Sequence, residues 1–128
     1  MFNRTGITKI TGSAPVQILF DVEHQMSVPV KVAAASENYV TENGRKIVKA
    51  GTPLAGDITT RNTAFTTTNT NTAVGLLLHD VDITDGAANA TMLLWGFVNL
   101  SRLGTSTAAL VTAAVKTALK GSVYFLKD

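Results

Sequence analysis

The sequence has no cysteine, little charge and no long apolar run. Without cysteine, disulfides, thiolate metal sites and a cysteine nucleophile are all excluded. Charged residues make up 16% of the chain and the formal net charge is +2, whereas a nucleic-acid-binding protein normally gathers positive charge on one face. No apolar run approaches the ~20 residues of a membrane span, and residues 1–12 lack the apolar core of a signal peptide. We expect a soluble protein, made in a cytoplasm, that binds neither nucleic acid nor membrane.

What the chain does have is enough apolar sequence for one domain. Hydrophobic residues are 45% of 128, a length that suits a single core. With so few charges, the surface must be rich in Thr, Asn, Ser and Gly, which weakly favours packing of protein on protein. We therefore predict a single β-rich domain over residues 15–128, preceded by an N-terminal arm over residues 1–14.

The arm over residues 1–14 is polar and has little periodicity. Two interpretations are open: a frayed terminus, or a tail that becomes ordered on a partner. In the second, Phe2, Ile7 and Ile10 are the apolar anchors. Arg4 and Lys9 then make the charged contacts.

Residues 73–85, AVGLLLHDVDITD, predict the central strand of the domain. The first part is apolar at every position, as in a strand buried on both faces. The second part alternates, with Val81 and Ile83 on one side and Asp82 on the other. The change falls at His79–Asp80, where a bulge or the rim of a barrel is expected.

Alternation predicts further strands before this one. Val16, Ile18, Phe20 and Val22 share one face of a half-buried strand. Residues 28–32 repeat the pattern around a proline, which cannot donate to a ladder and so indicates an edge strand. Residues 39–48 predict a hairpin, because the Asn-Gly pair at its centre tolerates the positive φ of a two-residue turn.

The segments around the central strand contain more turn residues. Residues 50–56 predict a Gly/Pro turn, residues 60–72 an exposed loop or a poorly formed hairpin, and residues 85–90 another turn. Residues 91–100 are apolar on both faces, with Trp95 and Phe97 on one. Such a strand belongs in the middle of a covered sheet or at a subunit interface. Gly96 within it indicates a close approach or a bend.

The last part of the chain changes period. Leu110 and Val115 fall on apolar stripes at helical spacing, Thr105 or Ser106 can cap the start, and Gly121 follows the end. This predicts one helix over about 106–120 and a closing strand over 123–126. The fold class is then mainly β (α+β): a small β-barrel or β-sandwich-like domain with a single helix in its C-terminal half.

The search for catalytic and metal-binding groups is mostly negative. The glycines of residues 51–56 have phosphate-loop spacing, but Asp57 stands where the lysine is needed. The acids of residues 80–85 lack the spacing of a calcium loop. His24 and His79 have no spaced partner that would make a metal site. We therefore expect no enzymatic activity, no catalytic residue, no cofactor and no metal.

Two stretches resemble a known family. KAGTPLAGDI and TAVGLLLHDVDITDGAANATMLLWGFVNLSRL are similar to the head decoration proteins of tailed bacteriophages, the family of the lambda head-stabilising protein. An A-G-T-x-L-x-G turn, an A-V-G-I/L-L strand entering a D-V-D segment, a hydrophobic strand containing glycine, a short helix and a final strand are common to both. The likeness extends over residues 47–127.

The resemblance implies a non-enzymatic structural protein on the virion exterior. It would bind the major capsid protein as a homotrimer at three-fold positions of an expanded capsid, and stabilise the shell against the pressure of packaged DNA. The family's N-terminal arm commonly lies on the capsid surface. By position, that role falls on Phe2, Asn3, Arg4, Ile7, Lys9 and Ile10.

Two other hypotheses are kept. One is a different virion component built on a similar β module, such as a tail or head–tail connector protein. The other is a small enzyme or ligand-binding barrel that uses His24, His79 and Asp82.

Overall fold

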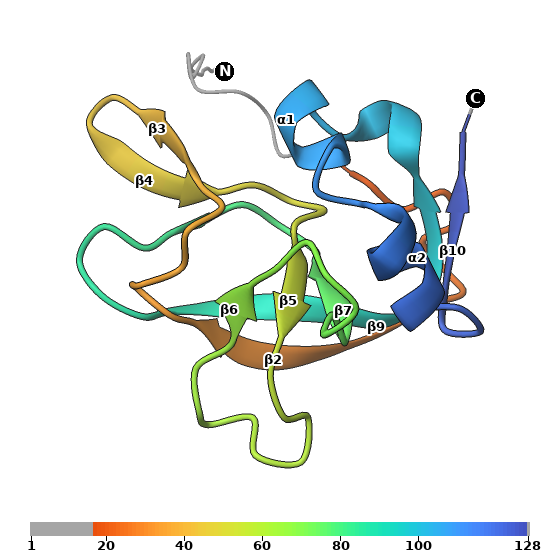
Figure 1. Cartoon of the computed structure of the whole chain (residues 1–128), viewed down its shortest axis with the longest axis horizontal. Helices are drawn as coiled ribbons and strands as arrows, with labels where there is room; N and C mark the ends of the chain where they lie inside the picture. Colours follow the sequence, from red (N-terminus) through yellow and green to blue (C-terminus); the bar gives the residue numbers. More distant parts are fainter. Residues whose placement is uncertain (1–16, 128) are drawn as a thin grey trace, which may run out of the picture.

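A computed structural model describes residues 17–127, which are built mainly from β-strands (Figure 1). The expected arm over residues 1–14 lies outside this part of the chain. The strands form a six-stranded sheet and a separate three-stranded sheet, and short helices lie near the C-terminal end. The predicted β-rich class is confirmed.

Strand β9 (Ala88–Asn99) is the centre of the six-stranded sheet. It pairs with β2 along one edge and with β7 and β10 along the other. The order is β10, β9, β7, β5, β6, and every pair is antiparallel except β10–β9. The other strands are β2 (Met26–Val32), β5 (Pro53–Ala55), β6 (Thr66–Thr67), β7 (Gly75–Leu77) and β10 (Val123–Leu126).

The prediction that residues 73–85 form the central strand is wrong. The buried half of this stretch is β7, which has only three residues, and the alternating half is β8 (Val81–Asp82) in the other sheet. The break falls at His79–Asp80, as the pattern indicated. There the Asp80 carboxylate accepts a hydrogen bond from the Ala50 amide at 2.7 Å, which holds the chain between the two sheets.

The small sheet contains the predicted hairpin. Its strands are β3 (Val40–Glu42), β4 (Arg45–Val48) and β8, in that order. Asn43 has φ 53° and Gly44 has φ 77°, so both turn residues take the positive φ of a two-residue hairpin turn. The hairpin extends from the body at the upper left of Figure 1.

The six-stranded sheet curls without closing into a barrel. Phe65, just before β6, forms one parallel bridge with Val32 of β2, and its amide donates to the Lys31 carbonyl at 2.7 Å. A barrel would need a continuous ladder at this seam. The bridge corrects the prediction for residues 60–72 in one respect: Phe65 is fully buried rather than part of an exposed loop.

Three local predictions require correction. The half-buried strand predicted over residues 16–22 is not formed by its described part, residues 17–22: Leu19 makes a single bridge to Val98, while Phe20 and Val22 are more than half exposed. The expected turn over residues 50–56 contains the buried strand β5. The expected turn over residues 85–90 is shorter, because β9 already begins at Ala88.

The helical segment connects two parallel strands, β9 and β10. Parallel neighbours need a long crossover, and residues 100–122 supply it with η1 (Leu100–Arg102), α1 (Thr105–Ala108) and α2 (Ala113–Ala118). The single helix predicted over 106–120 is therefore two short helices. Thr112 interrupts it with extended backbone (φ −80°, ψ 172°), and its hydroxyl accepts a hydrogen bond from the Val115 amide at the start of α2.

Two hydrophobic clusters lie on either side of β7 and β9. One packs α2 and the 17–19 segment against the β9–β10 end, and the other fills the curl between β2, β4, β5 and β9. β9 supplies Leu93 and Val98 to the first cluster and Met92 to the second. This strand therefore joins both halves of the core.

Candidate protein-binding surface

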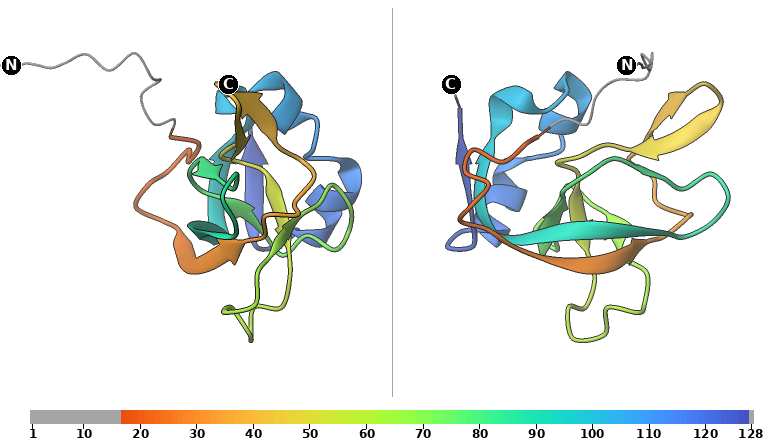
Figure 2. Two further views of the ribbon diagram at one scale, coloured as in Figure 1. Left: turned by 90° about the vertical axis from the view of Figure 1, so that its left-hand side faces the viewer. Right: turned by 180° about the vertical axis from the view of Figure 1, so that it is seen from behind.

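The β9–β10 end of the sheet has one covered face and one open face. Val123 and Phe125 of β10 pack into the cluster beneath α2. Because side chains alternate along a strand, Tyr124 and Leu126 point the other way, and they are 46% and 37% exposed. Figure 1 shows α2 over one side of this end, and Figure 2 shows the same end from behind.

The open face continues onto β9. Tyr124 is paired in register with Phe97, and their rings stack with centroids 5.4 Å apart. Trp95 meets Phe97 edge to face at 5.8 Å. Trp95 is 39% exposed, so β9 lies in the middle of the sheet but this face of it is open.

A third row lies beyond β9, on the edge opposite β10. Met26 pairs with Trp95, and the Phe20 amide donates to the Phe97 carbonyl at 2.7 Å. Met26 and Phe20 are 58% and 51% exposed. We call the whole set the outer aromatic face; it comprises Phe20, Met26, Trp95, Phe97, Tyr124 and Leu126.

Local irregularity in β9 shapes this face. The register with β2 shifts between Met26 and Ser27. At Gly96 a Cβ atom would meet Gln25 Cβ at 3.2 Å, so the close approach indicated by the sequence is confirmed. The bulge and the glycine let Gln25 lie against β9 while Trp95 turns outward.

β10 is also an edge strand. Within residues 17–127 it pairs only with β9, so one side of its backbone has no strand partner. Proteins usually protect such an edge with charge, proline or a bulge, and the sequence of β10, VYFL, has none of these. The open edge adjoins the outer aromatic face.

The six residues predicted to contact the capsid all lie outside the described part of the chain: Phe2, Asn3, Arg4, Ile7, Lys9 and Ile10. Their point of attachment is described. The Asn99 amide donates to the Ile18 carbonyl at 2.9 Å, and Arg102 Nη1 donates to the Gln17 carbonyl at 3.2 Å. The arm thus joins the domain next to the outer aromatic face.

Sequence reasoning identified only the middle of this face. Trp95 and Phe97 were singled out as core or interface, but the rows on either side were missed. Tyr124 and Leu126 carry a readable signal, because they alternate with apolar Val123 and Phe125 in a strand that has no polar side. Phe20 carries none, since the alternation of residues 16–22 indicates burial.

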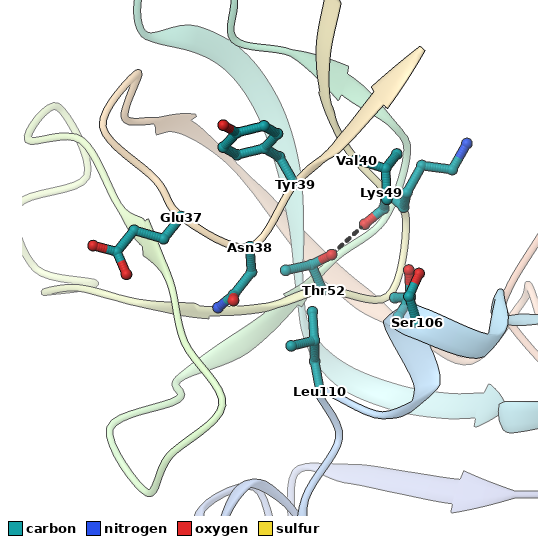
Figure 3. A pocket seen from close by; sticks show the side chains of 9 residues that line it. Glu37, Asn38, Tyr39, Val40, Lys49, Thr52, Ser106 and Leu110 are labelled. Atoms are coloured by element: carbon teal, nitrogen blue, oxygen red, sulfur yellow. Dashed lines mark hydrogen bonds between the residues drawn. The ribbon is translucent and has the colours of Figure 1, made fainter.

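A small hollow lies between the hairpin and α1 (Figure 3). It holds about 170 Å³, near the size of a cavity that accepts benzene. Lys49 on its wall is paired with Glu42 and Asp80, each at 3.1 Å, and the Thr52 hydroxyl donates to the Lys49 carbonyl at 2.7 Å. Lys49 and Thr52 are therefore held in place by other groups of the protein. Its lining is Glu37, Asn38, Tyr39, Val40, Lys49, Thr52, Ser106, Thr107 and Leu110.

The residues weighed for an enzyme have separate surroundings. His24 Nδ1 lies 2.6 Å from Asp21 Oδ2, and this hydrogen bond lowers the pKa of Asp21. His79 is exposed in the link between the two sheets. Asp82 bonds Arg45 in the small sheet. Within residues 17–127, His24 is thus paired with Asp21 and Asp82 with Arg45, so His24 and Asp82 have different partners.

The described residues, 17–127, hold neither a metal-binding cluster nor a membrane-spanning helix. In this range no three His, Asp or Glu side chains gather closely enough to hold a metal ion. The same range holds no helix that is both long and apolar enough to cross a membrane.

Neither a model of a protein family nor a curated protein sequence matches the chain.

Proposed function

We propose that this protein is a structural component of a tailed-bacteriophage head, which binds the outer surface of the expanded capsid and stabilises it. It works without catalysis, as a homotrimer at three-fold positions in contact with the major capsid protein. The observation that carries the proposal of a protein that works by assembly is the outer aromatic face: six large apolar side chains on a sheet end, beside the segment from which the arm extends. Exposed apolar surface of this kind marks interaction sites.

The family resemblance supplies the kind of assembly. Its motifs fall on coherent parts of the fold: the A-G-T-x-L-x-G residues enter β5, the A-V-G-L-L residues form β7, and the glycine-containing apolar strand is β9. The final strand of the pattern is β10, which carries one of the three rows of the outer aromatic face, Tyr124 and Leu126. The stretch that resembles the family therefore includes four of the six residues of this face as well as much of the core, whereas Phe20 and Met26 precede it.

The protein would stabilise the shell by adding contacts between capsid subunits, without any chemical reaction. Packaged DNA presses outward, and a trimer that bridges neighbouring capsid subunits adds buried area across their joints. An arm that becomes ordered on binding loses conformational entropy, so it binds only where the mature lattice presents its complete site. Each contact is small, and many symmetric copies act together.

Co-sedimentation tests the proposal. Purified protein is mixed with expanded, DNA-free shells, and we expect it to pellet with them to saturation. Deletion of residues 1–10 should lower the shell affinity at least tenfold while the circular dichroism spectrum is unchanged, because the domain over residues 17–127 keeps its core. A matched control is Thr8→Ala, which leaves all six predicted contact residues in place and should bind normally.

Two outcomes count against the proposal. If wild-type protein stays in the supernatant at saturating concentration, capsid decoration is wrong. If labelled protein instead gathers at a single vertex of intact particles, the alternative of a tail or head–tail connector protein replaces it.

A further inference from the structure

We propose that the outer aromatic face is the contact between copies of this chain, and that its two flanks meet each other across the subunit boundary. The first flank is Tyr124 and Leu126 of β10, and the second is Phe20 and Met26. The inference rests on the homotrimer of the proposed function, and it identifies the surface that joins the subunits. The N-terminal arm over residues 1–14 would then make the contact with the capsid.

The amount of apolar surface fits a second protein copy. The exposed members of the face are 37–58% accessible, and a large side chain of this kind offers about 150–250 Å². The six together present on the order of 500 Å² of apolar area, before the backbone edge of β10 is included. A specific interface buries about 800 Å² on each partner. In a ring the face is divided between two such contacts, so each flank forms the apolar centre of one contact, and the rim and the β10 edge supply the rest.

The composition of the face also favours a partner with the same kind of surface. All six side chains are uncharged, and the aromatic rings already pack on one another at 5.4 and 5.8 Å. A second copy of the chain presents matching uncharged, apolar rows to this face. The neighbouring edge of β10 gives the copy a line of backbone groups as well.

The geometry of the face suits a closed ring. Its flanks lie on opposite edges of β9: the register with Phe97 places Tyr124 on one side, and the Phe20 amide reaches Phe97 from the other. In a ring each copy uses two different patches, one toward each neighbour. Trp95 and Phe97 lie between the flanks and would approach the symmetry axis. Three copies can therefore bury the whole face without leaving a flank open.

The absence of cysteine makes a direct crosslinking test possible. Phe20 and Tyr124 are two strand spacings apart within one chain, about 9.5 Å, and a disulfide requires Cα atoms within about 7 Å. A bond between Phe20→Cys and Tyr124→Cys must therefore form between copies. We expect the double variant to give a covalent trimer on oxidation, while each single variant stays monomeric on a denaturing gel.

A measurement of the mass in solution provides a second test of the subunit contact. We expect full-length protein to have three times the 13.5 kDa mass of one chain, and Tyr124→Lys with Leu126→Lys to have the mass of one chain. Trp95 is the only tryptophan, so its emission should move to longer wavelength when the contact is lost. The control is Ile58→Lys, which alters a 47% exposed apolar residue outside the face and should leave the trimer intact.

The outcomes separate this inference from the proposed function. A lysine variant that keeps the trimeric mass overturns the assignment of the face. If that variant also loses shell binding, the face belongs to the capsid contact. Single-cysteine variants that crosslink to themselves would indicate a two-fold contact and overturn the ring. If the wild-type protein is a trimer but does not bind shells, capsid decoration is refuted, whereas the proposed subunit contact is still supported.

Discussion

At the scale of single residues, charge pairs hold the small sheet together. Arg45 lies between Asp82 and Asp85, with Nε and Nη2 each 2.7 Å from a carboxylate oxygen. The Arg45 hydrogen bond, followed by that of the Thr84 amide, lowers the pKa of Asp82 to about 2 from its ordinary 3.8. These groups are exposed, so each pair contributes modestly. They link β4 to β8, which pair over only two residues of each strand.

The lowered pKa gives a prediction for Asp82→Asn. Because the pKa of Asp82 is lower in the folded chain than in the unfolded chain, its carboxylate stabilises the fold above about pH 3.8, and this contribution disappears as the pH falls toward 2. We expect the variant to be less stable than wild type near neutral pH and equal to it near pH 2. Urea unfolding followed across this pH range measures the difference.

The control for this prediction is Glu37→Gln, whose carboxylate takes part in none of the ion pairs among residues 17–127. A deficit in Asp82→Asn that is the same at all pH values would show that the side chain matters through shape or hydrogen bonding, and would contradict the electrostatic account.

At the scale of elements, Thr112 decides where the helical segment divides. Its hydroxyl accepts from the Val115 amide at 3.3 Å and donates to the Asn69 carbonyl at 2.8 Å. One side chain thus caps α2 and fastens it to the threonine-rich loop before β7. α2 in turn covers the core beneath β10 through Val115 and Leu119.

We predict that Thr112→Ala lowers the free energy of unfolding by about 1–2 kcal/mol, the usual cost of an N-cap threonine. The matched control is Thr117→Ala, since its hydroxyl bonds back to the Ala113 carbonyl at 2.9 Å, an arrangement that does not favour a helix. Thr117→Ala should leave the free energy of unfolding unchanged or raise it slightly. Equal losses in both variants, measured by urea unfolding, would show that Thr112 is not a special position.

The elements that sequence reasoning predicted are those with a local cause. The hairpin follows from Asn43 and Gly44, β10 from four apolar residues after Gly121, and the edge position of β2 from Pro29. Gly75, in the A-V-G-L-L stretch, also has a local cause. A Cβ atom at this position would lie 2.6 Å from the Leu93 carbonyl oxygen, so only glycine fits.

The elements that it missed depend on distant partners. The central position of β9 depends on β2, β7 and β10 arriving from three parts of the chain. Phe20 alternates like a buried residue, but one bridge at Leu19 is all that ties its segment to the sheet. The outer aromatic face was half predicted for the same reason: Trp95 and Phe97 share one strand, whereas its flanks meet them only through tertiary pairing.

At the scale of the whole molecule, β9 joins the two core clusters, and we expect them to unfold as one cooperative unit. Leu93 and Met92 are neighbours in the chain but belong to different clusters. β9 also carries Trp95, whose ring meets Phe97 on the outer aromatic face. Loss of packing in either cluster should therefore loosen the same strand.

Phe65→Ala tests this coupling. Phe65 is fully buried in the cluster that does not contain the β10 end, and it bridges Val32 at the seam of the curled sheet. We expect its truncation to cost about 3–5 kcal/mol. Both the Trp95 fluorescence transition and the far-ultraviolet circular dichroism transition should move to lower urea by the same amount, because a two-state domain gives coincident transitions with different probes. If Trp95 keeps its wild-type midpoint while the circular dichroism midpoint falls, the clusters unfold separately, and β9 does not couple the seam to the outer aromatic face.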